Sequence, residues 1–174
     1  MRIRIGALAL SLAHGLATAG GYQDWQFGMT RTQVMAVGDP ARYYTFKNGD
    51  VGAGRVPFED TDALLSFYFT DGGMQRAMLI LHMGQDGPEA RRKWASAYAH
   101  LARVCGEVES AAAGAGPVAL DEALAAYDRG VPALVAMQRH QMGCLRMPAD
   151  ERVWASATRA GDGRIMVAVN YGVP

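Results

Sequence analysis

The chain holds two cysteines, Cys105 and Cys144, whose possible chemistry is the most tightly constrained in the sequence. The N-terminus resembles a secretory signal, and in an oxidising compartment an even number of cysteines favours a disulfide. Such a bridge closes a loop of about 40 residues, for which chain entropy predicts roughly 4 kcal/mol of stabilisation. The spacing is not Cys-x-x-Cys, so no redox motif is present. We therefore expect a structural disulfide between Cys105 and Cys144, with two buried free thiols as the alternative.

Two histidines near these cysteines define two metal-site alternatives. His100 and His140 complete a two-His, two-Cys set of the kind that binds zinc. On one helix, however, His100 and Cys105 point to different sides, which disfavours zinc. In an extended segment, His140, Met142 and Cys144 face one way and offer imidazole, thioether and thiolate ligands suited to Cu(I). A disulfide at Cys144 removes the thiolate, and methionine commonly fills cores, so we expect no metal or other cofactor.

The sequence contains no recognisable catalytic motif. A Gly-x-Ser-x-Gly nucleophile motif is absent. The carboxylates Glu59, Asp60 and Asp62 cluster together but lack the spacing of a calcium loop. The segment 52–54 (Gly-Ala-Gly) is too short for a phosphate-binding loop. We expect a non-catalytic protein, with an enzyme whose site is assembled from distant residues as an alternative.

Capping and turn residues predict the elements that carry these groups. Thr30 and Gln33 form a capping box for a short helix that ends at Gly38, and Asp86 begins a helix that runs to Cys105. A further short helix is expected over residues 120–127. Strands are expected over 43–46, 64–70, 74–83, 131–137, 141–147, 152–160 and 164–171. Segment 47–62 is expected to be a long exposed loop, and 111–117 a linker.

Together these elements predict an α+β fold, an antiparallel sheet built from hairpins with helices packed on one face. Residues 20–174 have the length of a single domain, which divides into possible halves 20–84 and 85–174.

The first 19 residues have the order of a cleavable signal peptide. Arg2 and Arg4 precede an apolar run over 5–16, and Ala17-Thr18-Ala19 supplies a small-x-small cleavage site. The run is shorter than the roughly 20 residues that a membrane span needs. We expect a periplasmic or secreted protein cleaved near Ala19, without a membrane span. No cysteine lies near the site, so no lipid anchor is expected.

The charge balance disfavours nucleic acid as a partner. Without Arg2 and Arg4, the chain has 15 basic and 17 acidic residues, a formal charge of −2. The arginines are scattered along the sequence, whereas nucleic-acid binding calls for a basic patch or stripe. We therefore expect no binding to nucleic acid.

One segment resembles a known family. Gly28-Met29-Thr30, Gln33-Val34, Gly38 and Pro40, followed by the aromatic segments 43–46 and 65–69, resemble the start of the SmpA/OmlA (BamE-like) outer-membrane assembly lipoproteins. The resemblance covers residues 27–82, and the lipid-bearing cysteine of that family is absent. It implies a module that presents loops and a sheet face to another envelope protein.

The functional expectation follows from this resemblance. The predicted loop 47–62, with Arg55 and Phe58, is the expected partner-binding surface. The function predicted is protein binding or accessory assembly work in a bacterial envelope. The alternatives are a periplasmic binder of a soft metal or a small ligand, and an enzyme with an unrecognised site.

Overall fold

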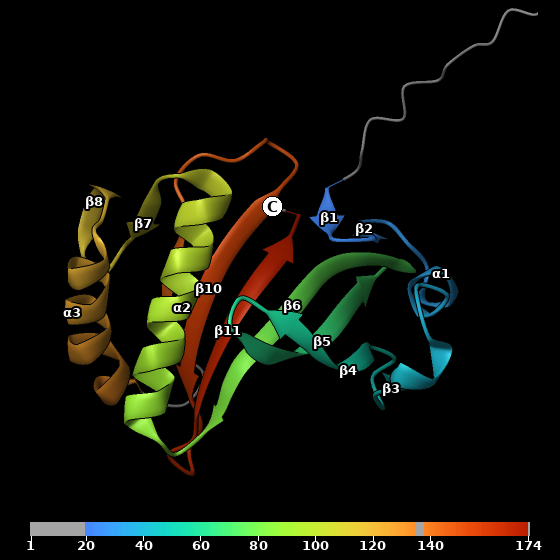
Figure 1. The fold of residues 1–174 in the computed structure, drawn as a ribbon, viewed down its shortest axis with the longest axis horizontal. Helices are drawn as coiled ribbons and strands as arrows, with labels where there is room; N and C mark the ends of the chain where they lie inside the picture. Colours follow the sequence, from blue (N-terminus) through green and yellow to red (C-terminus); the bar gives the residue numbers. More distant parts are fainter. Residues whose placement is uncertain (1–19, 135–137, 174) are drawn as a thin grey trace, which may run out of the picture.

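The computed structural model describes residues 20–134 and 138–173. Nine strands form one antiparallel sheet in the order β3-β4-β5-β6-β11-β10-β9-β7-β8 (Figure 1). These strands are β3 (Tyr44–Thr45), β4 (Val51–Phe58), β5 (Thr61–Thr70), β6 (Gly73–Gly84), β7 (Val108–Ser110), β8 (Gly114–Pro117), β9 (Arg139–Cys144), β10 (Arg152–Arg159) and β11 (Ile165–Gly172). A separate small sheet pairs β1 (Gly21–Tyr22) with β2 (Trp25–Gln26).

The helical elements in the described part of the chain are few. They are α1 (Arg31–Met35), α2 (Gly87–Cys105), α3 (Leu120–Gly130) and two 3₁₀ turns, η1 (Pro40–Arg42) and η2 (Val131–Ala133). None of the helices within the described ranges is both long enough and apolar enough to cross a membrane.

The fold is mainly β, so the expected α+β class with helices packed on one face of a sheet is wrong. The predicted hairpins are parts of one sheet. Strand β6 pairs with β11 along most of its length and joins the hairpins β5–β6 and β10–β11 into one open sheet. Two segments expected to be irregular also pair as strands, which raises the strand content further. Of the three helices, α1 spans only five residues.

Capping residues in the sequence predicted the ends of several elements correctly. The capping box of Thr30 and Gln33 starts α1, and the Asp86 carboxylate accepts a hydrogen bond of 2.8 Å from the backbone N–H of Glu89 at the start of α2. Gly106 ends α2 with a φ of 77°, a value that favours glycine. The hairpins β5–β6 and β10–β11 form where expected.

The expected long loop over 47–62 is wrong, because most of it forms β4 and the start of β5. Glycine in this segment serves packing within the sheet. A side chain at Gly52 would overlap the ring of Tyr44, which lies over it on the neighbouring strand, and Gly54 has a φ of 67° at the irregularity in the β4–β5 register. Residues that resemble a loop in composition therefore belong to a bulged strand.

Two other predictions also need correction. The expected linker 111–117 contains β8, which pairs with β7 at the edge of the sheet. The expected strand 131–137 begins instead with the turn η2, and residues 135–137 lie outside the described ranges.

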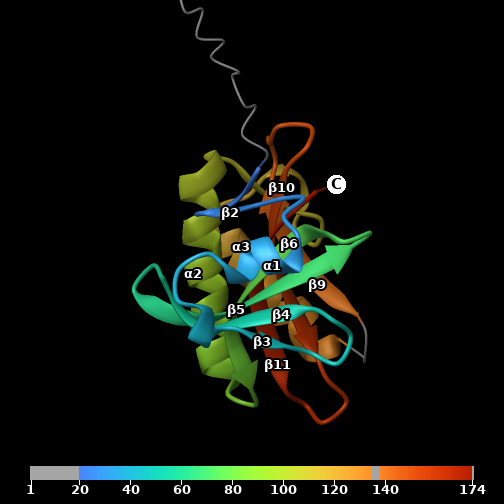
Figure 2. The same ribbon diagram turned by 90° about the vertical axis from the view of Figure 1, so that its right-hand side faces the viewer.

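The core lies between the sheet and the elements on its inner face. Along β6 the side chains of Ala77, Leu79 and Leu81 are buried in this core, as are Leu65 and Phe67 on β5. Helix α2 runs along this side of the sheet (Figure 2), and its Trp94 and Leu101 are fully buried. The alternate residues of the same strands therefore face the opposite, outer side.

Candidate functional site

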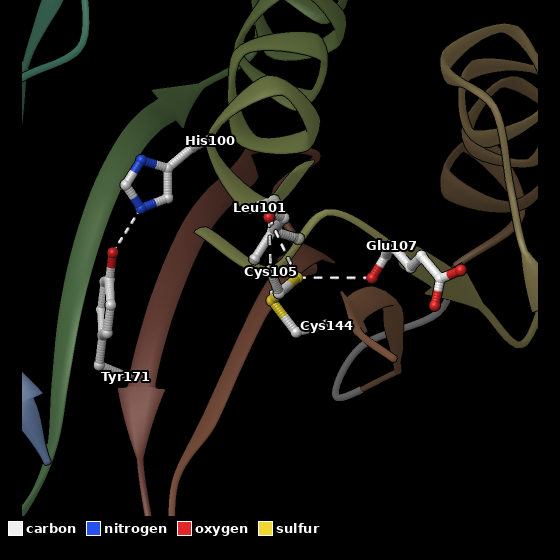
Figure 3. Close-up of a disulfide and its surroundings, with 6 residues drawn as sticks. All are labelled: His100, Leu101, Cys105, Glu107, Cys144 and Tyr171. Atoms are coloured by element: carbon white, nitrogen blue, oxygen red, sulfur yellow. Dashed lines mark hydrogen bonds between the residues drawn. A yellow bond between two sulfur atoms is a disulfide. The ribbon is translucent and has the colours of Figure 1, made fainter. Parts of the chain in front are cut away.

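The two cysteines form a bridge on the inner side of the sheet. Their sulfur atoms lie 2.13 Å apart and their Cα atoms 5.8 Å apart, which joins the end of α2 to the end of β9 (Figure 3). The backbone carbonyl of Leu101 contacts both sulfurs. A bridged Cys144 has no thiolate, so the copper-ligand set of His140, Met142 and Cys144 loses its strongest ligand.

His100 and His140, the two histidines considered as metal ligands, lie in different parts of the structure. His140 and Met142 both lie in the core, where the His140 ring packs 5.3 Å from that of Trp94. His100 hydrogen-bonds to groups on two other elements. Within residues 20–134 and 138–173, no three His, Cys, Asp or Glu side chains are arranged to hold a metal ion.

Arg55 and Phe58, the expected partner-binding residues, lie on β4 with opposite exposure. Arg55 is exposed, whereas Phe58 is buried and its ring lies 4.6 Å from the ring of His100. Phe58 therefore packs beneath the surface in this conformation. Partner binding through this strand remains a prediction.

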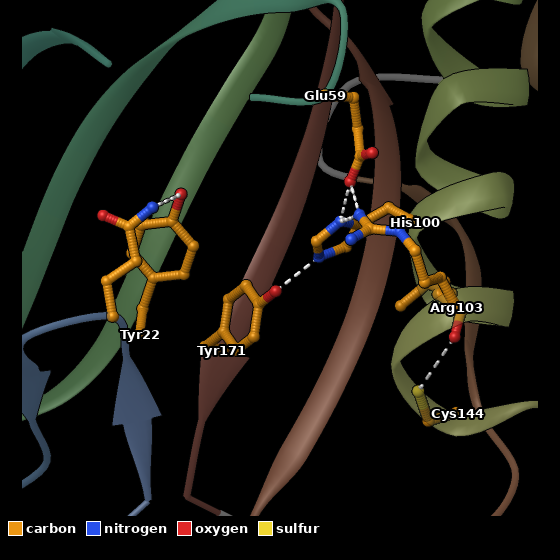
Figure 4. A network of polar contacts seen from close by, with 8 residues as sticks. Tyr22, Glu59, His100, Arg103, Cys144 and Tyr171 are labelled. Carbon is orange, nitrogen blue, oxygen red and sulfur yellow. Dashed lines mark hydrogen bonds and ion pairs between the residues drawn. The ribbon is translucent and has the colours of Figure 1, made fainter. Parts of the chain in front are cut away.

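A cluster of polar side chains joins three elements on the inner side (Figure 4). Glu59, in the β4–β5 turn, accepts hydrogen bonds from His100 and Arg103 of α2, and His100 Nε2 hydrogen-bonds to the hydroxyl of Tyr171 on β11. Because a carboxylate only accepts, His100 Nδ1 carries the proton and Nε2 accepts from the Tyr171 hydroxyl. Burial lowers the pKa of His100 and raises that of Tyr171.

The backbone of this cluster carries strain. Glu59 has a φ of 51°, which is uncommon for a residue other than glycine. A cavity of about 430 Å³ opens beside the cluster and is lined also by Tyr22. The polar groups of the cluster satisfy one another, so we interpret it as a network that holds the β4–β5 turn against α2.

A large hollow lies on the outer face of the sheet. It is a groove with a volume of about 680 Å³ that crosses β5, β6, β11 and β10 to the start of β9. We call it the outer groove. Its lining residues are Phe46, Ser66, Tyr68, Arg76, Met78, Ile80, Met83, Arg139, Trp154, Ser156, Thr158, Arg159, Ala160, Gly161, Met166 and Asn170.

The strand registers explain why these side chains share a surface. Met78 lies opposite Ser66 on β5 and Asn170 on β11, and Asn170 lies opposite Trp154 on β10. Two polar groups of the floor bond to each other, since the Asn170 amide donates to Ser156 Oγ at 3.3 Å. What the outer groove offers a ligand is therefore mainly apolar surface, from methionine, isoleucine and aromatic side chains.

The charges of the outer groove are all of one sign. Its lining includes three arginines, Arg76, Arg139 and Arg159, and no aspartate or glutamate. Arg76 stacks on the ring of Tyr68 at 3.9 Å, and Arg159 donates to the Pro132 carbonyl at 2.7 Å. Hydrogen bonds to a carbonyl and stacking on a ring leave the positive charge uncompensated.

Two carboxylates lie beyond the rim of the outer groove, one at each end. Asp50, which lies near Tyr68 and Arg76, accepts hydrogen bonds from the neutral Asn48 side chain and from the Phe69 backbone, so it keeps its negative charge. Asp162, in the β10–β11 turn, pairs with Arg164. The lining of the outer groove is therefore apolar and carries only positive charge, which is opposed at the Arg76 end by Asp50.

Sequence reasoning missed the outer groove. The signal was the pattern of β6, in which Arg76, Met78 and Ile80 alternate with the buried Ala77, Leu79 and Leu81, so that both faces of the strand carry large apolar residues. A strand that is apolar on both faces indicates a second surface with a use of its own.

Comparison with family models, with curated proteins and with solved structures found no match to this chain. The resemblance of residues 27–82 to the SmpA/OmlA family therefore remains a prediction.

Proposed function

We propose that this protein is a non-catalytic binding module whose outer groove holds a small anionic molecule with an apolar body. The observation that carries the proposal is the combination of an apolar hollow of about 680 Å³ with three arginines and no carboxylate in its lining. Sites for small molecules are concave, mostly apolar and roughly 300–1,000 Å³ in volume, with a few polar groups that fix orientation. An anionic amphiphile complements both properties.

The flexible side chains of the outer groove suit a ligand of variable shape. Met78, Met83 and Met166 line it together with Trp154. Methionine side chains are unbranched and polarisable, so they adapt to irregular apolar surfaces. This favours recognition of an alkyl chain over recognition of a rigid polar molecule.

The setting proposed for this function is the bacterial envelope. The Cys105–Cys144 bridge supports it, since disulfides persist in oxidising compartments. Export itself rests on the signal pattern of residues 1–19, which lie outside the described ranges. A protein partner, as the SmpA/OmlA resemblance implies, remains the competing prediction.

The test is a titration followed by the emission of Trp154. The other two tryptophans, Trp25 and Trp94, are buried on the inner side of the sheet, so Trp154 reports on the outer groove. Dodecanoate, added below its micelle concentration, should shift the emission to shorter wavelength and saturate. Dodecyltrimethylammonium, with the same chain and the opposite charge, should bind about tenfold more weakly or not at all.

Two controls make the titration specific. The Trp154→Phe variant should lose the optical change while calorimetry still detects dodecanoate. Equal binding of the two amphiphiles would show that only apolar surface is recognised and would contradict the proposal. Absence of binding by either would also contradict it and would turn attention to a protein partner.

A further inference from the structure

The outer groove has two ends with different electrostatics. At one end Arg76 and Trp154 lie beside the β5–β6 hairpin, and at the other end Arg139 and Arg159 lie beside the β10–β11 turn. Resting on the function proposed above, we propose that the ligand is a single-chain carboxylate or similar monoanion with a fixed direction. Its anionic head binds at Arg139, and its chain runs along the strands towards Trp154.

The strand register places Arg139, the proposed head-group site, beside the apolar floor of the outer groove. Arg139 lies opposite Thr158 on β10, and Thr158 lies opposite Met166 on β11. Trp154 is four residues before Thr158 on β10, which is about 13 Å along an extended strand. A long alkyl chain with its head at Arg139 therefore reaches the Trp154 ring by lying over Met166 and its neighbours.

The arginines at the Trp154 end are already occupied. The guanidinium of Arg76 stacks on Tyr68, and that of Arg152, just outside the lining, lies 5.2 Å from the centre of the Trp154 ring. Asp50 adds a negative charge at this end, since it adjoins Tyr68 and Arg76. The negative charge of Asp50 reduces the attraction that this end offers to an anion.

The arginines at the opposite end have fewer partners. Within the described ranges Arg139, which lies opposite Thr158, makes no ion pair. Arg159 is the next residue after Thr158 on β10, and its guanidinium donates to the Pro132 carbonyl in η2. Asp162 in the adjacent turn is held by Arg164. The unpaired guanidinium of Arg139 is therefore the site offered to a carboxylate, because charge-assisted hydrogen bonds to arginine are among the strongest available.

Bromine-labelled chains test this direction, because bromine quenches tryptophan only when it lies against the ring. The probes are 2-bromohexadecanoate, labelled beside the head, and 16-bromohexadecanoate, labelled at the far end of the chain. Both should bind with similar affinity by calorimetry. The second should quench the emission of Trp154 strongly and the first weakly, and neither should quench the Trp154→Phe variant.

Arginine variants test the head-group site independently. The Arg139→Gln variant should weaken hexadecanoate binding about tenfold, as expected for the loss of one charge-assisted hydrogen bond. The Arg76→Gln variant should change the affinity by about twofold or less. The matched control is Arg92→Gln, which should leave binding unchanged. Arg92 is an exposed arginine on α2 that pairs with Glu89.

The outcomes separate this inference from the function on which it rests. Strong quenching by 2-bromohexadecanoate, or loss of affinity in Arg76→Gln but not in Arg139→Gln, would place the head at the Trp154 end. The direction would then be wrong while the outer groove remained the binding site. Absence of binding by all hexadecanoates would overturn both the direction and the proposed function.

Discussion

At the residue scale, the arginines on the outer face and the histidines on the inner face have different roles. Arg139 makes no ion pair within the described ranges and keeps its charge at the surface, which suits capture of an anion. His100 and His140 are buried, and His100 uses both ring nitrogens in hydrogen bonds. A buried neutral histidine stabilises the fold through packing and hydrogen bonding for as long as it stays neutral.

Burial makes stability depend on pH through these histidines. Desolvation lowers the pKa of both His100 and His140 from the ordinary value of 6.5. The unfolded chain therefore binds more protons than the folded chain once the pH falls below about 6.5. The free energy of unfolding should be highest above that pH and should decrease on acidification until the folded-state pKa values are passed.

Urea unfolding at a series of pH values between 7.5 and 5 measures this effect. Each unit by which burial lowers a pKa contributes about 1.4 kcal/mol to the decrease. The His140→Phe variant should show a shallower dependence, because one of the two buried histidines is gone. A free energy of unfolding that is flat or rises on acidification would contradict the assignment of neutral buried histidines.

At the scale of elements, the sequence predicted what is encoded locally. Asp86 and Gly106 bound α2 because a cap needs only a side chain and a few neighbouring backbone groups. The strands of the hairpins β5–β6 and β10–β11 were predicted for the same reason. Strand β4 was missed, because Gly52 and Gly54 have the composition of a loop. The role of Gly52 depends on Tyr44 of another strand, a contact that no local pattern encodes.

The disulfide links two elements that are distant in sequence, and its removal should be costly. The double variant Cys105→Ala/Cys144→Ala should lower the free energy of unfolding by about 4 kcal/mol, because the unfolded chain regains the entropy of an open loop. Chemical denaturation of the variant and of the oxidised parent measures the difference.

The same variant serves as a control for the groove. The bridge lies on the inner side of the sheet, so dodecanoate binding should persist in the variant under conditions where it is folded.

A decrease of less than about 1 kcal/mol in the free energy of unfolding of the double variant would contradict a stabilising role for the bridge.

At the scale of the whole molecule, the pairing of β6 with β11 decides both the fold and the site. It merges two hairpins into one open sheet, so the molecule is mainly β. It also brings Met78 beside Asn170, and thus Trp154 into the same surface as Tyr68. Long-range pairings of this kind have no signature in a single sequence, which is why the fold class could not be predicted from it. The apolar residues on both faces of β6 indicate a second surface, but only the pairing shows which strands share that surface.

The most direct test of the account is the location of a bound anionic amphiphile among the methionines. Methyl-¹³C spectra report each methionine separately. Met78, Met83 and Met166 line the outer groove, whereas Met74 and Met142 are buried on the inner side. Dodecanoate should shift the methyl resonances of the first three and leave those of the last two unchanged. Shifts confined to Met74 and Met142, or no shifts at all, would contradict the outer groove as the binding site.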